Sequence, residues 1–375
     1  MSRWYFIEQF LKRQYLKWLE KVFAREILSP AQIEWSEVKR ILVVRQHDLL
    51  GDFLLATPAL RALRQRFPAA HIGVLVRAYF AGAARHHPEV NEVLVFDKSA
   101  LSPWLMLWRQ LRRKWDLAVV LNTVSHSTTS DWLAYLSGAR YILGSAHLPL
   151  PGGTRNFFYN LLAPYAARVK HQSERNLDIV RYIGADTSDL SETMRVLESE
   201  KNAAAVKLRH LGLQQHGAVI GMHVGAGKLM NRWPITRFSE LAQWLGERYA
   251  IEIVLFWGPQ EEALRRRFCE ALPFSPIKFA PTTLREMAAA FTQCHAIVCN
   301  DTGVMHVAAA VGTPLVAIFG PTDPQEWKPI GKKFVAVRGK EQKVESADSQ
   351  QVFEALRELL EEKLQKHAAF NQPAE

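Results

Sequence analysis

The chain contains few cysteines. Only Cys269, Cys294 and Cys299 occur among its 375 residues, and no two of them form a CxxC pair. Disulfide frameworks and structural zinc sites need more cysteines, or closer spacing, than this. The sequence therefore argues against both, and a reducing compartment fits its composition.

Long apolar runs are also missing. A membrane-spanning helix needs about 18 or more consecutive apolar residues, and no such run occurs. The N-terminus lacks an unbroken apolar core and a small-residue cleavage site, so we expect no secretory signal.

The common nucleotide-binding fingerprints are absent as well. The chain has no GxGxxG and no GxxxxGK[ST] motif, and Gly221-x-x-x-Gly225-x-Gly227-Lys228 is only a partial echo of the second. A dinucleotide enzyme or an ATP hydrolase is therefore disfavoured.

Positive charge is abundant. Lysine and arginine number 47 against 37 aspartate and glutamate, which gives a net charge of +10. Such a balance favours acidic partners such as phosphates, anionic lipid or nucleic acid, although a basic protein without such partners has the same composition. No nucleic-acid-binding motif occurs, so we expect no nucleic acid partner.

The first 28 residues are predicted to form one helix within a separate segment, residues 1–30. A basic helix rich in aromatics is typical of a membrane interface with anionic headgroups, and we favour that interpretation over packing on the protein's own surface or in a dimer. Arg13, Lys17 and Lys21 form the basic column. The apolar face expected from helical spacing consists of Trp4, Ile7, Leu11, Tyr15, Trp18, Leu19 and Val22.

Strands and helices alternate along the rest of the chain, which predicts an α/β protein with doubly wound parallel sheets. A chain of 375 residues favours two such domains, at residues 38–185 and 213–340. A final helix, 348–366, is expected to pack back toward the N-terminal domain. The segment Leu148–Pro164 is expected to be a loop, and Thr193–Leu197 a strand. The strands expected in the two sheets are Ile41–Val44, His71–Val76, Val93–Phe96, Leu117–Leu121, Tyr141–Leu143, Ala218–Met222, Ile251–Trp257, Ile277–Phe279, Ala296–Cys299, Leu315–Phe319 and Phe334–Val337.

Polar turns follow several of these strands. In doubly wound sheets, ligands bind at the carboxyl ends of the strands. The turn His47–Asp52 ends in a carboxylate at the start of a helix. Asp52 is placed either as a general base for an incoming hydroxyl or as a residue that favours the helix dipole.

Two further polar turns lie within Asn300–Pro324. Asp301 or Thr302 is predicted to cap a helix, and Gly303 leaves backbone NH groups open to an anion. His306 lies one turn later; it points at the same anion or is a core histidine with its own partner. Thr322 offers a hydroxyl after the next strand.

Basic side chains occur in several polar loops. They are suited to neutralising a diphosphate or holding an anionic acceptor. A solvated surface charge is the alternative for each one. These residues are Arg45, Arg155, Lys170, Lys228 and Arg232.

Two long stretches carry a family resemblance. ILVVRQHDLLGDFLLATPALRALRQRFP and NDTGVMHVAAAVGTPLVAIFGPTDP resemble glycosyltransferase family 9, the lipopolysaccharide heptosyltransferases, and WPITRFSELAQWL and VLFWGPQEE match more loosely. The resemblance covers roughly residues 40–335. It implies a GT-B architecture of two Rossmann-like domains facing each other across a cleft. The implied reaction is inverting transfer from ADP-heptose to the inner core of lipopolysaccharide.

The resemblance also implies site residues. Asp52 matches the general base, and either Glu261 or Glu262 matches the acidic residue that binds the ribose. The donor-binding residues that it implies or places nearby are His223, Lys228, Arg232, Asp301, Thr302, Gly303, His306 and Thr322, and those assigned to the acceptor are Arg45, His47 and Asp48. No metal and no cofactor are implied, and the enzyme is expected in the cytoplasm, peripherally attached to the inner face of the cytoplasmic membrane.

This chain departs from the family pattern at two places. Asn231 stands where the family commonly has a lysine, and the turn with His47 and Asp48 is one residue longer. Both indicate a divergent member. Two alternative functions stay open: a GT-B sugar-nucleotide epimerase or hydrolase, and a non-catalytic protein that binds nucleotide or polysaccharide.

Overall fold

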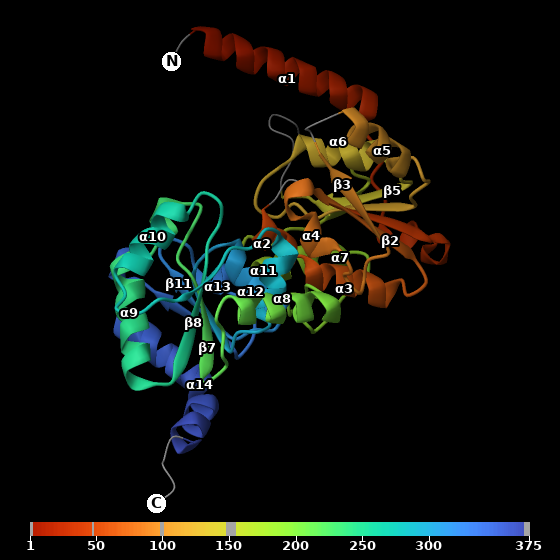
Figure 1. The fold of residues 1–375 in the computed structure, drawn as a ribbon. Helices are drawn as coiled ribbons and strands as arrows, with labels where there is room; N and C mark the ends of the chain where they lie inside the picture. The colour runs from red at the N-terminus through yellow and green to blue at the C-terminus, as the bar shows by residue number, and fades with distance from the viewer. Residues whose placement is uncertain (1–2, 47–48, 98–100, 148–154, 371–375) are drawn as a thin grey trace, which may run out of the picture. The chain divides into compact units, whose positions relative to one another are not determined.

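The structure is a computed structural model that describes residues 3–46, 49–97, 101–147 and 155–370, and it divides into two α/β units (Figure 1). The first unit comprises Met1–Leu49 and Leu55–Leu190, and the second comprises Leu50–Leu54 and Ser191–Glu375. The five residues Leu50–Leu54 thus belong to the second unit, although the chain on both sides of them belongs to the first.

The first unit is built on a six-stranded parallel sheet of order β3-β2-β1-β4-β5-β6. This is the order of a Rossmann fold. The central strand is apolar and buried along almost its whole length, as expected when helices cover both faces of a sheet. The strands span β1 Arg40–Arg45, β2 His71–Arg77, β3 Glu92–Phe96, β4 Leu117–Val120, β5 Tyr141–Ser145 and β6 Leu161–Ala163. The helices are α1 Arg3–Phe23, α3 Thr57–Arg66, α4 Ala81–Ala84, α5 Leu101–Leu111, α6 Thr128–Leu136 and α7 Gln172–Arg181.

The second unit repeats this topology with the order β12-β11-β10-β7-β8-β9. Counted from β7, the order is again that of a Rossmann fold, and its switch point lies between β7 and β10. The strands span β7 Ala218–His223, β8 Ile251–Phe256, β9 Ile277–Phe279, β10 Ala296–Asn300, β11 Leu315–Phe319 and β12 Phe334–Arg338. The helices are α2 Leu50–Leu54, α8 Glu198–His210, α9 Ile235–Arg248, α10 Glu262–Glu270, α11 Leu284–Phe291, α12 Gly303–Ala310, α13 Pro324–Trp327 and α14 Ser349–Phe370.

All eleven expected sheet strands are present, and the differences lie elsewhere. β6 falls in the segment expected to be a loop, because its pairing with β5 is a long-range contact that local composition does not reveal. Thr193–Leu197 forms no strand; Met194 instead donates its backbone NH to Ala310 O at 3.0 Å. Short 3-10 turns occur at Pro30–Gln32, Trp35–Glu37, Ala78–Phe80, Leu229–Asn231, Lys340–Gln342 and Val344–Ser346.

The N-terminal helix differs from its expected form. α1 ends at Phe23, and its inward face is Leu16 and Leu19, which are buried in a core cluster with residues of α5 and α6. Four members of the expected apolar face have described side chains: Leu19 is buried, whereas Tyr15, Trp18 and Val22 are more than half exposed. The side chains of Trp4, Ile7 and Leu11 lie outside the described residues. Within the described part of the chain, no helix is both long and apolar enough to cross a bilayer.

The C-terminal helix α14 packs on the core of the second unit, and its expected packing toward the N-terminal domain stays a prediction. Val352, Phe353, Leu356 and Leu360 are buried in the core cluster of that unit, together with residues of α9. The sequence predicts that this helix has an apolar face, but not which sheet the face packs against, because that depends on contacts with residues distant in the sequence.

Candidate functional site

Three turns of the second unit meet at Asp301, which directly follows β10 at the switch point of the sheet. Asn231, in the loop after β7, donates its side-chain amide to the backbone carbonyl of Asp301 at 3.1 Å and to Oδ2 at 3.3 Å. Thr322, in the turn after β11, donates its hydroxyl to the same Oδ2. Asp301 is buried, and this burial raises the pKa of its carboxyl, although the Thr322 hydrogen bond and the charges of His306 and Lys228 oppose the rise.

Helix α12 begins next to this carboxylate. Its N-cap is Thr302, not Asp301, and the Thr302 hydroxyl accepts a hydrogen bond from the Val304 NH at 3.3 Å. Asp301 is therefore free of the capping role and takes part in the turn network described above. Backbone NH groups at a helix start favour an anion, and the Asp301 carboxylate directly precedes such a helix start.

His306 lies one turn into α12 and is buried. Its Nδ1 is 2.8 Å from Oε1 of Glu192, a residue of the segment that precedes α8. Burial by itself would lower the pKa of His306, but the carboxylate of Glu192, with further contributions from Asp301 and Asp52, raises it above its ordinary value. His306 is thus a core histidine with its own partner, and it lies within electrostatic reach of two site carboxylates.

The short helix α2 brings Asp52 to this site. Its residue Gly51 packs so closely on the imidazole that a Cβ at Gly51 would lie 2.6 Å from Cδ2 of His306. At Gly303, the first residue of α12, the contact is less tight: a Cβ built on the glycine would lie 3.3 Å from Cβ of Leu50. Asp52 is half-buried in the first turn of α2. Two glycines therefore permit the contact between helices that places Asp52 near His306.

The loop after β7 forms the other edge of the site. Glu261 accepts a hydrogen bond from the Gly258 NH at 2.7 Å, and its Oε2 lies 3.4 Å from Nε2 of the buried His223. Burial lowers the pKa of His223, while the charge of Glu261 opposes this. A Cβ at Gly225 would lie 1.8 Å from Oε1 of Glu261, so a side chain there would displace the Glu261 carboxylate.

The basic residues of this loop differ in their contacts. Arg232 donates to the backbone carbonyl of Ala226 at 2.8 Å and so closes the loop on itself. Lys228 is exposed, and its charge acts on Asp301. Of the two acidic candidates after β8, Glu261 lies in the site, whereas Glu262 is exposed and bonded to Arg265 at 2.8 Å.

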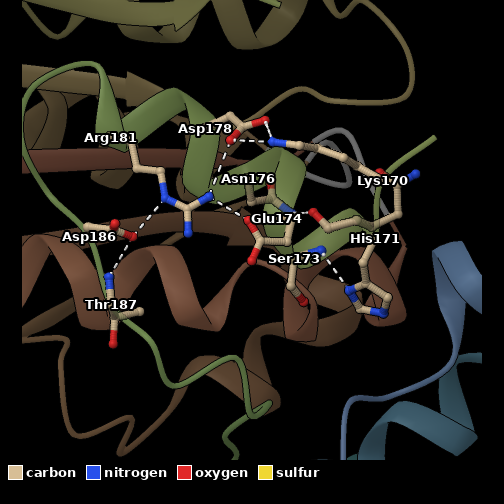
Figure 2. Close-up of polar contacts among 10 residues, drawn as sticks. Lys170, His171, Ser173, Glu174, Asn176, Asp178, Arg181, Asp186 and Thr187 are labelled. Carbon is tan, nitrogen blue, oxygen red and sulfur yellow. Dashed lines mark hydrogen bonds and ion pairs between the residues drawn. The ribbon is translucent and has the colours of Figure 1, made fainter. Parts of the chain in front are cut away.

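The remaining sequence candidates belong to the first unit. Arg45 is buried at the end of β1 and is therefore not a solvated surface charge. His47 and Asp48 lie outside the described residues. Lys170 is bonded to Asp178 on α7 at 2.6 and 2.8 Å, which Figure 2 shows beside the contacts of Arg181. Arg155 donates to the backbone carbonyl of Arg25 at 2.7 Å. Lys170 and Arg155 are thus engaged in contacts within the first unit.

Two residues of the site were missed by sequence reasoning. Glu192 lies immediately before Thr193–Leu197, the segment that was expected to be a strand. Asn300 is fully buried, donates to the carbonyls of Val224 and Gly225, and accepts from the Trp233 NH. A polar amide at the end of an apolar strand was the available signal for Asn300, whereas Glu192 carried none.

The fold and the site define a class. Two α/β units with Rossmann topology, similar in fold to a solved heptosyltransferase, agree with the GT-B fold class that the sequence predicted. A model of glycosyltransferase family 9 (heptosyltransferase) matches residues 104–356. The chain belongs to this family and is a glycosyltransferase, which confirms the resemblance.

Individual relatives agree with this assignment. The chain is 25% identical to the lipooligosaccharide heptosyltransferase 2 of Haemophilus influenzae over 307 residues, 77% of this chain and 86% of that one. The structure of the Escherichia coli ADP-heptose LPS heptosyltransferase II is similar with a TM-score of 0.71 and 26% identity, over 86% of this chain and 99% of that one. A family 9 glycosyl transferase from Veillonella parvula has a TM-score of 0.75 and 23% identity, over 90% and 99% of the two chains, and supports the fold.

Proposed function

We propose that this enzyme transfers a heptose, or a related sugar, from ADP-heptose to the inner core of lipopolysaccharide with inversion, and that Asp52 is the general base. The names of the Haemophilus and Escherichia coli relatives support the donor and the acceptor. The assignment of Asp52 as the base is supported by the packing of α2 on α12, because α2 belongs to the same unit as the Asp301 turn. A carboxylate there is suited to accept the proton of an incoming hydroxyl.

On the donor side, we assign the diphosphate to the start of α12 and to Lys228. The helix NH groups and a cation would stabilise the charge that develops on the leaving group. Arg232 is engaged with the Ala226 carbonyl, whereas Lys228 is exposed and its charge reaches the turn at Asp301. Lys228 therefore takes the place of the family lysine that Asn231 replaces.

The ribose and acceptor assignments follow the same logic. Glu261, held by Gly258 and His223, is the acidic residue that we assign to the ribose. Arg45, His47 and Asp48 remain our candidates for holding the anionic acceptor. We assign no metal and no cofactor to the reaction, and in this proposal the base and the charge-stabilising groups come from the chain itself.

We also propose that the enzyme acts in the cytoplasm, at the inner face of the cytoplasmic membrane, and that α1 contacts the anionic lipid surface. Tyr15, Trp18 and Val22 are exposed beside the exposed Lys17 and Lys21. Helix α5, whose inward leucines share a core cluster with α1, also exposes apolar side chains, and exposed arginines follow it. Aromatic and basic side chains together favour an interface with anionic headgroups.

The Asp52→Asn variant tests the function. We expect transfer from ADP-heptose to lipopolysaccharide core to fall by about 10²-fold or more, because the amide cannot accept the proton. Asp178→Asn is the matched control, since this carboxylate is bonded to Lys170 in the first unit, and it should retain activity.

The alternatives give other outcomes. Product formed from ADP-heptose without acceptor would favour an epimerase or hydrolase. Cellular function that survives Asp52→Asn would favour a non-catalytic binding protein.

A further inference from the structure

Glu192 is a buried acid that the roles assigned so far do not use. Its side chain is only 1% exposed. Oε1 lies 2.8 Å from Nδ1 of His306, and Oε2 has no hydrogen-bond partner among the described residues. Burying an ionised carboxylate is costly unless an opposite charge compensates. The imidazole of His306 is the group placed to do so.

The imidazole is held on its opposite edge by α2. Gly51 lies against Cδ2 and Nε2 of the ring, with distances of 2.6 and 3.2 Å from a Cβ built on the glycine. The ring therefore lies between the Glu192 carboxylate and the backbone turn that carries Asp52.

The charged groups that act on His306 come from three elements. Glu192 acts from the segment before α8, Asp52 from α2 and Asp301 from the turn before α12. All three are carboxylates, and together they outweigh the effect of burial, so the pKa of His306 is raised. Lys228 acts on Asp301 in turn.

We infer that Glu192 is a positioning residue for the transfer reaction. Its carboxylate pairs with Nδ1 and so holds His306 as an imidazolium whose Nε2 edge faces α2. The positive charge of the ring complements and orients the Asp52 carboxylate. This inference rests on the proposed function, in which Asp52 is the base. In that step the acceptor oxygen bonds to the anomeric carbon while its proton passes to Asp52. The bond from the anomeric carbon to the diphosphate breaks, and the diphosphate leaves with the electron pair. The imidazolium keeps its protons throughout.

A structural clamp is the alternative role for the same contact. Glu192 lies two residues before Met194, whose NH bonds to Ala310 O at the end of α12, so the pair also ties this segment to α12. A clamp contributes to stability but not to the protonation state that catalysis needs. The two roles therefore differ in how activity depends on pH.

The test uses Glu192→Gln in the full-length enzyme. Glutamine keeps the shape and a hydrogen bond to Nδ1 but removes the charge. We expect the alkaline limb of the kcat profile to move to lower pH and kcat at about pH 8 to fall about 10-fold, by analogy with the smallest losses that follow removal of a group orienting a metal-binding histidine. The KM for ADP-heptose should change little. In Glu192→Asp, which keeps the charge, the alkaline limb of the kcat profile should stay at the wild-type pH.

A second readout needs no substrate. NMR titration of the His306 ring should show that it is more than half protonated at pH 6.5 in the wild type, and less so in Glu192→Gln. Glu286→Gln is the matched control, because it removes a carboxylate bonded to Lys207 in the same unit, and it should change neither readout.

Each outcome has a distinct meaning. A Glu192→Gln enzyme with a wild-type pH profile overturns the positioning role, even if its thermal stability falls. If that variant does not fold, a wild-type His306 that is mostly neutral at pH 6.5 overturns it. An Asp52→Asn variant with full activity overturns the base assignment itself, independently of Glu192.

Discussion

The side-chain amide of Asn231 donates to both the backbone carbonyl and the carboxylate of Asp301, at 3.1 and 3.3 Å. Family 9 was expected to have a lysine at this position. The asparagine instead supplies two hydrogen bonds from a neutral donor to a buried acid, and Lys228 of the same loop is the cation that we propose for the site. The substitution is thus compatible with the fold of the turn.

We expect Asn231→Ala to lower the free energy of unfolding by about 1–3 kcal/mol, because it leaves buried acceptors on Asp301 without these donors. Affinity for ADP should fall as well. Asn231→Asp should destabilise more at pH 7 than at pH 4, since two carboxylates repel each other only when both are ionised. Urea denaturation at both pH values and calorimetry with ADP measure these effects. Asn202→Ala, at an exposed position on α8, is the control; equal losses in both alanine variants would contradict the prediction.

Gly51→Ala tests the contact between α2 and α12. The added Cβ would lie 2.6 Å from the His306 ring, so α2 or the ring must shift. We expect a loss of about 1–3 kcal/mol in stability, typical of overpacking, and a fall in kcat larger than the change in KM. Gly246→Ala is the matched control, because a Cβ there lies 3.4 Å from the Phe274 ring, in ordinary contact. It should keep full activity and gain up to about 1 kcal/mol in helix stability. Wild-type kinetics in Gly51→Ala would mean that α2 tolerates the shift.

His87 should govern part of the acid stability of the first unit. Burial, aided by the charge of Arg61, lowers the pKa of His87 from 6.5 to about 4. Since the unfolded chain takes up this proton first, stability is fully present above pH 6.5 and is lost as pH falls toward 4. The loss from this residue should reach about 3 kcal/mol.

Denaturation of His87→Asn across this pH range should show a flatter curve than that of the wild type. The exposed neighbour provides the control, His86→Asn. His86 has a φ of 62°, a conformation that asparagine tolerates. Parallel pH curves for wild type and His87→Asn would show that the buried imidazole does not resist protonation.

The exposed face of α1 should bind anionic membranes. Deleting the helix is a poor test, because Leu16 and Leu19 belong to the core of the first unit. The double variant Tyr15→Ser, Trp18→Ser alters side chains that are 57% and 56% exposed, and should fold normally. We expect it to bind phosphatidylglycerol vesicles at least about ten-fold more weakly, because each aromatic ring buries apolar area in the interface.

Vesicle sedimentation measures this binding, and added salt should weaken it in the wild type. Tyr79→Ser, at a ring that is 75% exposed elsewhere in the first unit, is the control. Unchanged sedimentation of the double variant, with loss of a dimer on gel filtration, would instead assign this face to a contact between copies.

The architecture was largely predictable from local pattern. Runs such as Ile41–Val44 and Leu315–Phe319 are apolar throughout, because helices cover both faces of each parallel sheet. β6 and the packing of α14 were not predictable, since each depends on contacts with residues distant in the sequence. The docking of α1 was not predictable for a related reason: apolar side chains occur on more than one side of this helix, and only packing decides that Leu16 and Leu19 are the ones buried.

The candidate site was likewise predictable where local pattern defines it and not where tertiary contacts do. The turns at Asp52, Asp301 and Thr322 were recognisable because they follow strong strands, and a family pattern covers them. The sequence left Glu261 and Glu262 equivalent, whereas the contacts of Glu261 with Gly258 and His223 separate them. The capping of α12 by Thr302 rather than Asp301 was likewise decided by backbone geometry.

The sequence by itself determined that the chain forms two α/β units and which turns end their strands, because apolar periodicity and turn chemistry act over a few residues. Only the tertiary structure decided that the turn around Asn300–Pro324 is joined by residues from two distant segments. Asp52 reaches it because Gly51 and Gly303 let α2 pack on α12, and Glu192 reaches it by pairing with His306. Such contacts depend on the shape and charge of surfaces that exist only after the chain has folded.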